Sequence, residues 1–131
     1  MLLEGDLGSG KSELARATIR ALAGAPIEVP SPTFTLVQSY ELGALEVGHA
    51  DLYRLGGIDE AIELGLEELW RHGALLVEWP ERAAGLWPDE RLTIRLEAVP
   101  AAGTGVRRAQ LSGTGRWVGL LPRLAEAVGS G

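Results

Sequence analysis

The stretch Gly5-Asp-Leu-Gly-Ser-Gly-Lys-Ser12 decides the fold of this chain. It matches the pattern G-x-x-x-x-G-K-[ST], in which backbone N–H groups of a glycine-rich loop surround the phosphates of a nucleotide. Leu2-Leu3-Glu4 before it is typical of the end of a strand, and residues 12–23 after it are typical of a helix. The sequence therefore predicts a phosphate-binding P-loop; the alternative is a glycine-rich turn that binds nothing.

The residue types of the loop agree with phosphate chemistry. Backbone N–H groups of Gly8, Ser9, Gly10 and Lys11 are expected to form an anion nest at the start of the helix. Lys11 is the only lysine among twelve basic residues, and a P-loop needs a compact point charge rather than the rigid fork of arginine. We expect Lys11 to contact only the ligand, and Ser12 to place its hydroxyl on a Mg²⁺ ion.

A P-loop also needs a carboxylate at the end of a neighbouring strand, which holds the metal or its water. Ala74 to Val77 is the most apolar run of the chain and predicts a buried parallel strand that ends at Glu78. Asp51 ends another predicted strand and is the second candidate; either acid could instead be an ordinary exposed residue. His49 lies two residues before Asp51, but the chain has only one other histidine, so a histidine metal site is not expected.

Ser31-Pro-Thr-Phe-Thr35 is a stiff connector, since Pro30 and Pro32 restrict its backbone. Its hydroxyl groups could sense a γ-phosphate as a switch segment does, or the segment could be a rigid surface turn. Residue types alone favour packing roles for Tyr53 and Trp79.

The remaining pattern predicts a mixed α/β fold in a single domain spanning residues 1–131. Expected elements are a hairpin (36–42 and 45–51), a helical segment broken at Gly65 (58–70), a second hairpin (91–96 and 106–111) and a final helix (117–128). Three residues before the loop are too few for a whole central strand. We therefore expect an incomplete central strand and an exposed apolar groove, with lower stability or self-association as the result.

Composition excludes several classes of protein. The chain is 46% hydrophobic and 23% charged, with a mean hydropathy of +0.09, and its longest aliphatic runs are too short to span a bilayer. Its first residues have no basic region typical of a secretory signal, and the absence of cysteine agrees with a cytoplasmic location. A net charge of −6 without a basic run argues against sequence-specific binding of nucleic acid by this chain alone.

Five motifs, in this order and spacing, resemble the TsaE (formerly YjeE) family of small bacterial ATPases in tRNA threonylcarbamoyladenosine biosynthesis. They are Gly-Asp-Leu-Gly-Ser-Gly-Lys-Ser, Ser-Pro-Thr-Phe-Thr-Leu-Val, Asp-Leu-Tyr-Arg-Leu, Glu-Leu-Gly-Leu-Glu-Glu and Val-Glu-Trp-Pro-Glu-Arg. The likeness runs from about Leu3 to Arg82. Members of the family have a further segment before the loop, and its absence here is the expected reason for the short first strand.

The resemblance implies an α/β, P-loop NTPase-like three-layer sandwich with a mostly parallel central sheet and an antiparallel hairpin extension. It also implies an ATPase that uses ATP and Mg²⁺ and acts on the TsaB–TsaD complex. The catalytic residues would be Lys11, Glu78, Asp51 and Thr35. The nucleotide would be bound by Gly8, Ser9, Gly10, Lys11, Ser12, Glu13, Thr33 and Trp79, and the metal by Ser12 and Glu78.

Two other functions stay open, a small-molecule kinase and a nucleotide-gated module that does not hydrolyse. A kinase needs an arginine-bearing lid, whereas residues 51–70 contain one arginine, Arg54, and many acids, which favours a partner surface. Arg54 and Arg82 are the nearest arginines to the motifs, and neither is clearly placed to neutralise a transferring phosphoryl group. We therefore expect slow hydrolysis alone and acceleration by the partner, through an acidic surface formed by Glu60, Glu63, Glu67 and Glu68.

Overall fold

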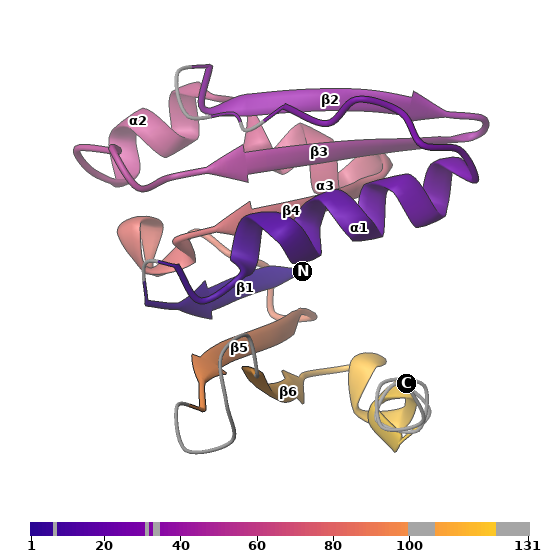
Figure 1. Cartoon of the computed structure of the whole chain (residues 1–131). Helices are drawn as coiled ribbons and strands as arrows, with labels where there is room; N and C mark the ends of the chain where they lie inside the picture. Colours follow the sequence, from indigo (N-terminus) through magenta and orange to yellow (C-terminus); the bar gives the residue numbers. More distant parts are fainter. Residues whose placement is uncertain (7, 31, 33–34, 100–106, 123–131) are drawn as a thin grey trace.

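A six-stranded sheet with the order β2-β3-β4-β1-β5-β6 forms the centre of the protein (Figure 1). The computed structural model describes residues 1–6, 8–30, 32, 35–99 and 107–122. Its strands are β1 (Leu2–Gly5), β2 (Val37–Leu42), β3 (Leu45–Asp51), β4 (Ala74–Glu78), β5 (Leu92–Ala98) and β6 (Arg107–Gly113). Strands β3, β4, β1 and β5 are parallel, while β2 and β6 pair antiparallel at the two edges. The predicted α/β fold class is confirmed.

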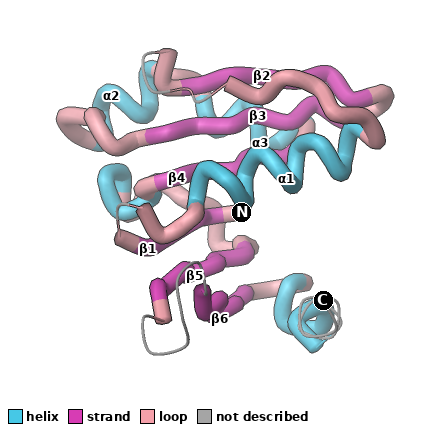
Figure 2. Tube along the Cα trace, in the orientation of Figure 1, coloured by secondary structure: helices cyan, strands magenta, loops and turns pink. Residues whose placement is uncertain are grey.

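Helices cover both faces of the sheet (Figure 2). Helix α1 (Lys11–Ala23) packs on one face, and α2 (Ile58–Glu63), α3 (Leu66–His72) and the 3₁₀ helix η1 (Pro80–Ala83) pack on the other. Gly65 separates α2 from α3 with a φ of 72°, which confirms the predicted break. Residues 117–122 are helical, and the rest of the predicted final helix lies outside the described residues.

Two apolar cores follow from the alternation of side chains along the strands. Leu3 and Leu76 point toward α1 and pack against Ala15 and Ile19. Their neighbours in sequence, Leu2, Leu75 and Val77, point the other way and pack under α2, α3 and η1. Because both faces are covered at the centre of the sheet, Leu2 and Leu3 of β1 and residues 74–77 of β4 are apolar at every position, as a doubly covered strand requires.

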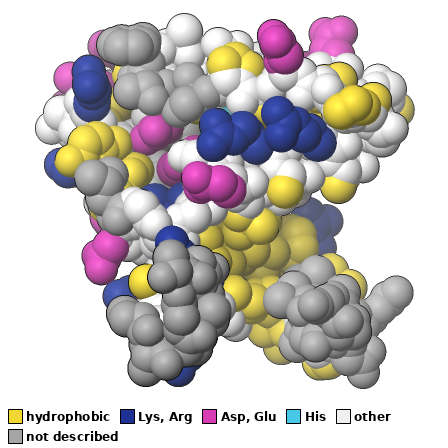
Figure 3. All heavy atoms as spheres, in the orientation of Figure 1, with side chains coloured by type: hydrophobic (Ala, Val, Ile, Leu, Met, Phe, Trp, Pro, Cys, Tyr) yellow, Lys and Arg dark blue, Asp and Glu magenta, His cyan; other side chains and the backbone are white. Residues whose placement is uncertain are grey.

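The first strand is short and central, as predicted: β1 has four residues and lies between β4 and β5. Figure 3 shows a group of hydrophobic side chains at the surface beside α1. The apolar groove expected from the short first strand stays a prediction. The turn predicted between β5 and β6 lies outside the described residues. Within the described part of the chain, no helix is long and apolar enough to cross a membrane.

Gly73, between α3 and β4, tests how tightly the sheet is packed. A Cβ atom there would overlap the backbone carbonyl oxygen of Glu46 and lie 3.0 Å from its carbon. Gly73→Ala is therefore expected to destabilise the fold by about 1–3 kcal/mol, measured as a lower Tm. Gly57→Ala is the control, because nothing lies within 4 Å of that Cβ and its φ of 171° is extended. Equal Tm values for the two variants would contradict this packing.

Candidate functional site

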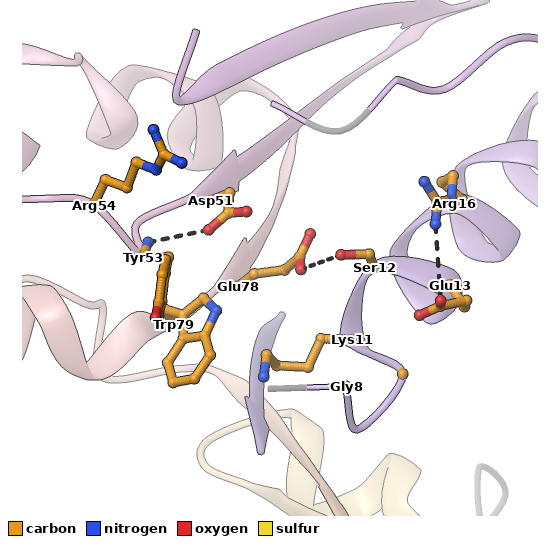
Figure 4. Close-up of a pocket in the computed structure, with 11 residues that line it drawn as sticks. Gly8, Lys11, Ser12, Glu13, Arg16, Asp51, Tyr53, Arg54, Glu78 and Trp79 are labelled. Atoms are coloured by element: carbon orange, nitrogen blue, oxygen red, sulfur yellow. Dashed lines mark hydrogen bonds and ion pairs between the residues drawn. The ribbon is translucent and has the colours of Figure 1, made fainter. Parts of the chain in front are cut away.

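A cavity of about 440 Å³ lies where β3 and β4 end, in front of the N-terminus of α1 (Figure 4). Because parallel strands end at the same edge of the sheet, residues far apart in sequence meet there. The cavity is lined by Gly8, Gly10, Lys11, Ser12, Glu13, Arg16, Asp51, Tyr53, Arg54, Glu78 and Trp79. Eight of the predicted site residues, Gly8 among them, therefore line the same cavity.

Glycines allow the loop between β1 and α1 to wrap around this space. Gly5, Gly8 and Gly10 have φ values of 143°, 79° and 105°, which L side chains rarely adopt. At Gly5 a Cβ atom would also lie 2.5 Å from the carbonyl oxygen of Leu96. Ser9 is buried and lines a second cavity of about 320 Å³ on the other side of the loop, beside the end of β5.

Lys11 is buried and is held by the protein itself. Its Nζ donates hydrogen bonds to the carbonyl oxygens of Gly5 (2.5 Å) and Asp6 (2.9 Å) and lies 3.9 Å from the centre of the Trp79 ring. Burial lowers the pKa of Lys11, although nearby carboxylates oppose that change. The expectation that Lys11 contacts only a ligand is wrong, because the side chain also ties the start of the loop.

Glu78 is the carboxylate that meets the loop. Its Oε1 accepts a hydrogen bond of 2.7 Å from the Ser12 hydroxyl, and its Oε2 lies 2.6 Å from Nε2 of His49. Burial pushes the pKa of Glu78 up, but the hydrogen bonds from His49 and Ser12 and the charge of Lys11 hold it below its usual range. Glu78 is therefore an ionised carboxylate with a defined orientation.

Asp51 lies beside Glu78 because the two residues are register partners on β3 and β4. It accepts a hydrogen bond of 3.0 Å from the backbone N–H of Tyr53. Burial is the largest cause of a raised pKa at Asp51, and the neighbouring Glu78 raises it further. Of the two candidate carboxylates, Glu78 contacts Ser12, whereas Asp51 lines the cavity next to it.

The donor set fits a Mg²⁺ ion that arrives with a nucleotide. Among the described residues, no group of three or more histidines, cysteines or acids could hold a metal by itself. Mg²⁺ commonly binds through one or two protein oxygens together with phosphates and water. The oxygens of Ser12 and Glu78, 2.7 Å apart at the cavity wall, are such a pair.

Trp79 is brought into the cavity by an unusual backbone conformation. Its φ of 60° lies in the left-handed region, which costs a non-glycine residue roughly 1–3 kcal/mol. In this conformation the indole lies against Lys11 and against the Tyr53 ring, 5.0 Å away between centroids. Both aromatic residues line the cavity, beyond the packing role that their residue types favour.

Two arginines line the site, and sequence reasoning missed Arg16. Arg16 and Arg54 both line the cavity, on opposite sides of Glu78 in Figure 4, whereas the motifs indicate Arg54 only as one of the arginines nearest to them. Arg16 follows Ser12 by one helical turn, a spacing from which it could have been found. Arg82 instead lies over the Tyr53 ring, at 5.6 Å.

Arg107 at the start of β6 is a further residue that the motifs do not reveal. Its guanidinium donates hydrogen bonds to the carbonyl oxygens of Ser9 (3.0 Å) and Gly8 (3.2 Å). No local pattern predicts these bonds, because 98 positions separate Arg107 from Ser9. The backbone of the loop is thus held from the outside as well as by Lys11.

The predicted switch segment is described only in part. Thr35 is exposed, lies outside the set of residues that line the cavity, and accepts a hydrogen bond of 3.3 Å from Gln38. Ser31 and Thr33 lie outside the described residues. A switch role for Thr33 and Thr35 stays a prediction.

Comparisons with known proteins identify the family and the fold of this chain. Residues 1–107 match the family model described as "Threonylcarbamoyl adenosine biosynthesis protein TsaE". The tRNA threonylcarbamoyladenosine biosynthesis protein TsaE of Rickettsia bellii is 39% identical over 97 residues, covering 74% of this chain and 67% of that protein. The Bacillus subtilis protein of the same name is 37% identical over 116 residues, covering 88% and 70%.

The match does not extend over the full length of every relative. With TsaE of Rickettsia conorii the identity is 38% over 99 residues, and the chain spans 57% of that protein. The crystal structure of YdiB from Bacillus subtilis superposes with a TM-score of 0.70 at 29% identity, covering 96% of this chain and 76% of that one. The family match over most of the chain and this P-loop structure lead to one conclusion: the chain belongs to the TsaE family.

Proposed function

We propose that this protein binds ATP with Mg²⁺ in the cavity and hydrolyses it in support of tRNA N6-threonylcarbamoyladenosine biosynthesis. One observation carries the proposal: the Ser12 hydroxyl meets the buried carboxylate of Glu78 directly behind a loop of P-loop sequence. The pathway rests on the names of the relatives, which are tRNA threonylcarbamoyladenosine biosynthesis proteins.

In this proposal the loop binds the phosphates through its backbone N–H groups, at the positive end of α1. Lys11 exchanges its carbonyl partners for phosphate oxygens, and Arg16 and Arg54 supply further positive charge from the cavity wall. Mg²⁺ would polarise the terminal phosphoryl group and neutralise charge that develops there. Asp51 faces the same space and would orient the attacking water.

The proposed partner is the TsaB–TsaD complex. Part of the acidic surface expected to meet it is compensated within the chain, because Glu67 pairs with Arg71 at 2.9 Å and Glu68 with His72 at 3.5 Å. The reason to expect an arginine from the partner is that the motifs clearly place none in this chain. Arg16 and Arg54 line the cavity, so that reason no longer applies. Acceleration by the complex therefore rests on membership of the TsaE family.

Phosphate release without any acceptor tests the proposed function. The isolated protein should release phosphate slowly from ATP, and TsaB–TsaD should accelerate it more at low salt than at high salt if charges steer the contact. Release only in the presence of a small metabolite would identify a kinase. ATP binding without any release would identify a nucleotide-gated module.

Lys11→Ala should lower the affinity for MgADP by about 100-fold or more, since removing a buried charged partner commonly costs 2–5 kcal/mol. Titration calorimetry measures this affinity. A modest fall in Tm is also expected, because the carbonyl groups of Gly5 and Asp6 lose their donor. Unchanged nucleotide affinity would contradict the P-loop assignment.

Glu78→Gln should still bind ATP but hydrolyse it about 10- to 100-fold more slowly, because an amide keeps the shape but lacks the charge that organises the metal site. Single-turnover phosphate release measures the effect. Asp51→Asn is the paired variant. If hydrolysis survives in Glu78→Gln and is lost in Asp51→Asn, the roles of the two carboxylates are exchanged.

Arg107→Ala should weaken MgADP binding by about 3- to 10-fold, the range expected when hydrogen bonds worth about 1 kcal/mol no longer hold the loop. Arg108→Ala is a matched control, because it removes the same charge from the next position of β6. Calorimetry on both variants decides the question. An equal loss in both would show a general charge effect in place of a specific hold on the loop.

A further inference from the structure

His49 is a buried polar residue that packing does not explain. It lies on β3 with no exposed surface, on the face that carries the apolar core formed by Leu3, Val47 and Leu76. Its Nδ1 has no hydrogen-bond partner among the described residues. A buried polar atom without a partner costs free energy, and an apolar side chain of similar size would avoid that cost. The reason for a histidine at this buried position must therefore lie in the contact of its other nitrogen, Nε2.

Among the residues that the structure describes, that nitrogen forms its hydrogen bond with Glu78. Nε2 lies 2.6 Å from Oε2 of Glu78, while the Ser12 hydroxyl donates to Oε1 of the same carboxylate at 2.7 Å. An ionised carboxylate only accepts hydrogen bonds, so Nε2 of His49 is the donor to Glu78. The imidazole and the hydroxyl thus take one oxygen each, and together they set the rotation of the carboxylate about its last bond.

Occupation of Oε2 by His49 leaves Oε1 as the oxygen that faces Ser12 and the cavity. Without the imidazole, the carboxylate could turn and offer both oxygens to a cation, or approach Lys11, which faces the same cavity. Octahedral Mg²⁺ tolerates little change in ligand position, and partners behind a ligand commonly change metal affinity by 10- to 100-fold.

We propose that His49 is a positioning residue, which holds Glu78 so that a single carboxylate oxygen is presented beside Ser12 to nucleotide-bound Mg²⁺. The proposal rests on the proposed function of the cavity. It concerns orientation: His49 contacts Glu78 but is not among the residues that line the cavity, and it takes no part in the chemistry itself.

Three variants separate positioning from simple filling of space. His49→Phe keeps an aromatic ring but removes the donor. His49→Gln offers an amide N–H close to the place of Nε2. Val47→Ala is the control, because Val47 is equally buried on the same strand and face but makes no hydrogen bond to Glu78.

The measurement is the affinity for ADP by calorimetry, with saturating Mg²⁺ and with EDTA, together with Tm. His49→Phe should reduce the gain in affinity that Mg²⁺ provides by about 10-fold or more, while leaving the affinity in EDTA unchanged. His49→Gln should restore most of that gain. Val47→Ala should lower Tm and leave the gain as in the wild-type protein. The same Mg²⁺ gain in His49→Phe as in Val47→Ala, or failure of the glutamine to restore it, would overturn the proposal.

A second observation does not depend on a folded His49 variant. In proton NMR of the wild-type protein, Nε2–H should give a slowly exchanging, strongly downfield signal that moves upfield in Glu78→Gln, since the charge of the acceptor is lost. An unchanged signal would show that the imidazole does not donate to Glu78. If Mg²⁺ does not raise the affinity of the wild-type protein for ADP, the proposed function fails. If Mg²⁺ raises this affinity in the wild-type protein and equally in His49→Phe, the proposed function stands and the positioning role fails.

Discussion

The buried carboxylate of Glu78 is the constraint on which the functional end of this structure depends. A charge out of water is costly unless donors surround it. Those donors come from two other elements, the Ser12 hydroxyl on α1 and the His49 imidazole on β3. The hydrogen bonds that satisfy one charge therefore tie β3, β4 and the first turn of α1 together, and they shape the wall of the cavity at the same time.

The loop in front of this carboxylate is held in place by basic side chains on its two sides. From within the site, Lys11 donates hydrogen bonds to carbonyl groups at the start of the loop. From β6, Arg107 donates hydrogen bonds to the carbonyl groups of Gly8 and Ser9. The carbonyl groups of Gly5, Asp6, Gly8 and Ser9 therefore all accept hydrogen bonds from side chains. A loop that is already held in one conformation loses less conformational entropy when it binds an anion. Pre-organisation of this kind favours affinity.

The cavity wall carries side chains of both charges, and their arrangement gives its two carboxylates different properties. Asp51 and Glu78 lie side by side on neighbouring strands, opposed by Lys11, Arg16 and Arg54 on the walls. Two adjacent carboxylates repel each other, so the raised pKa of Asp51 and the lowered pKa of Glu78 reflect different surroundings: Asp51 is chiefly desolvated, whereas Glu78 is desolvated but bound by strong donors. The pair is suited to two different roles at one site.

The sequence by itself determined the P-loop, the order of helices and strands, the break at Gly65 and the candidacy of Glu78, because each depends on local spacing or on the period of the hydrophobic pattern. Only the tertiary structure decided that Ser12 meets Glu78 in preference to Asp51, that His49 holds the same carboxylate, and that Arg107 reaches the loop. These contacts arise from the register of parallel strands and from the return of β6 to the sheet. Both join residues distant along the chain, and no local pattern encodes their distance in space.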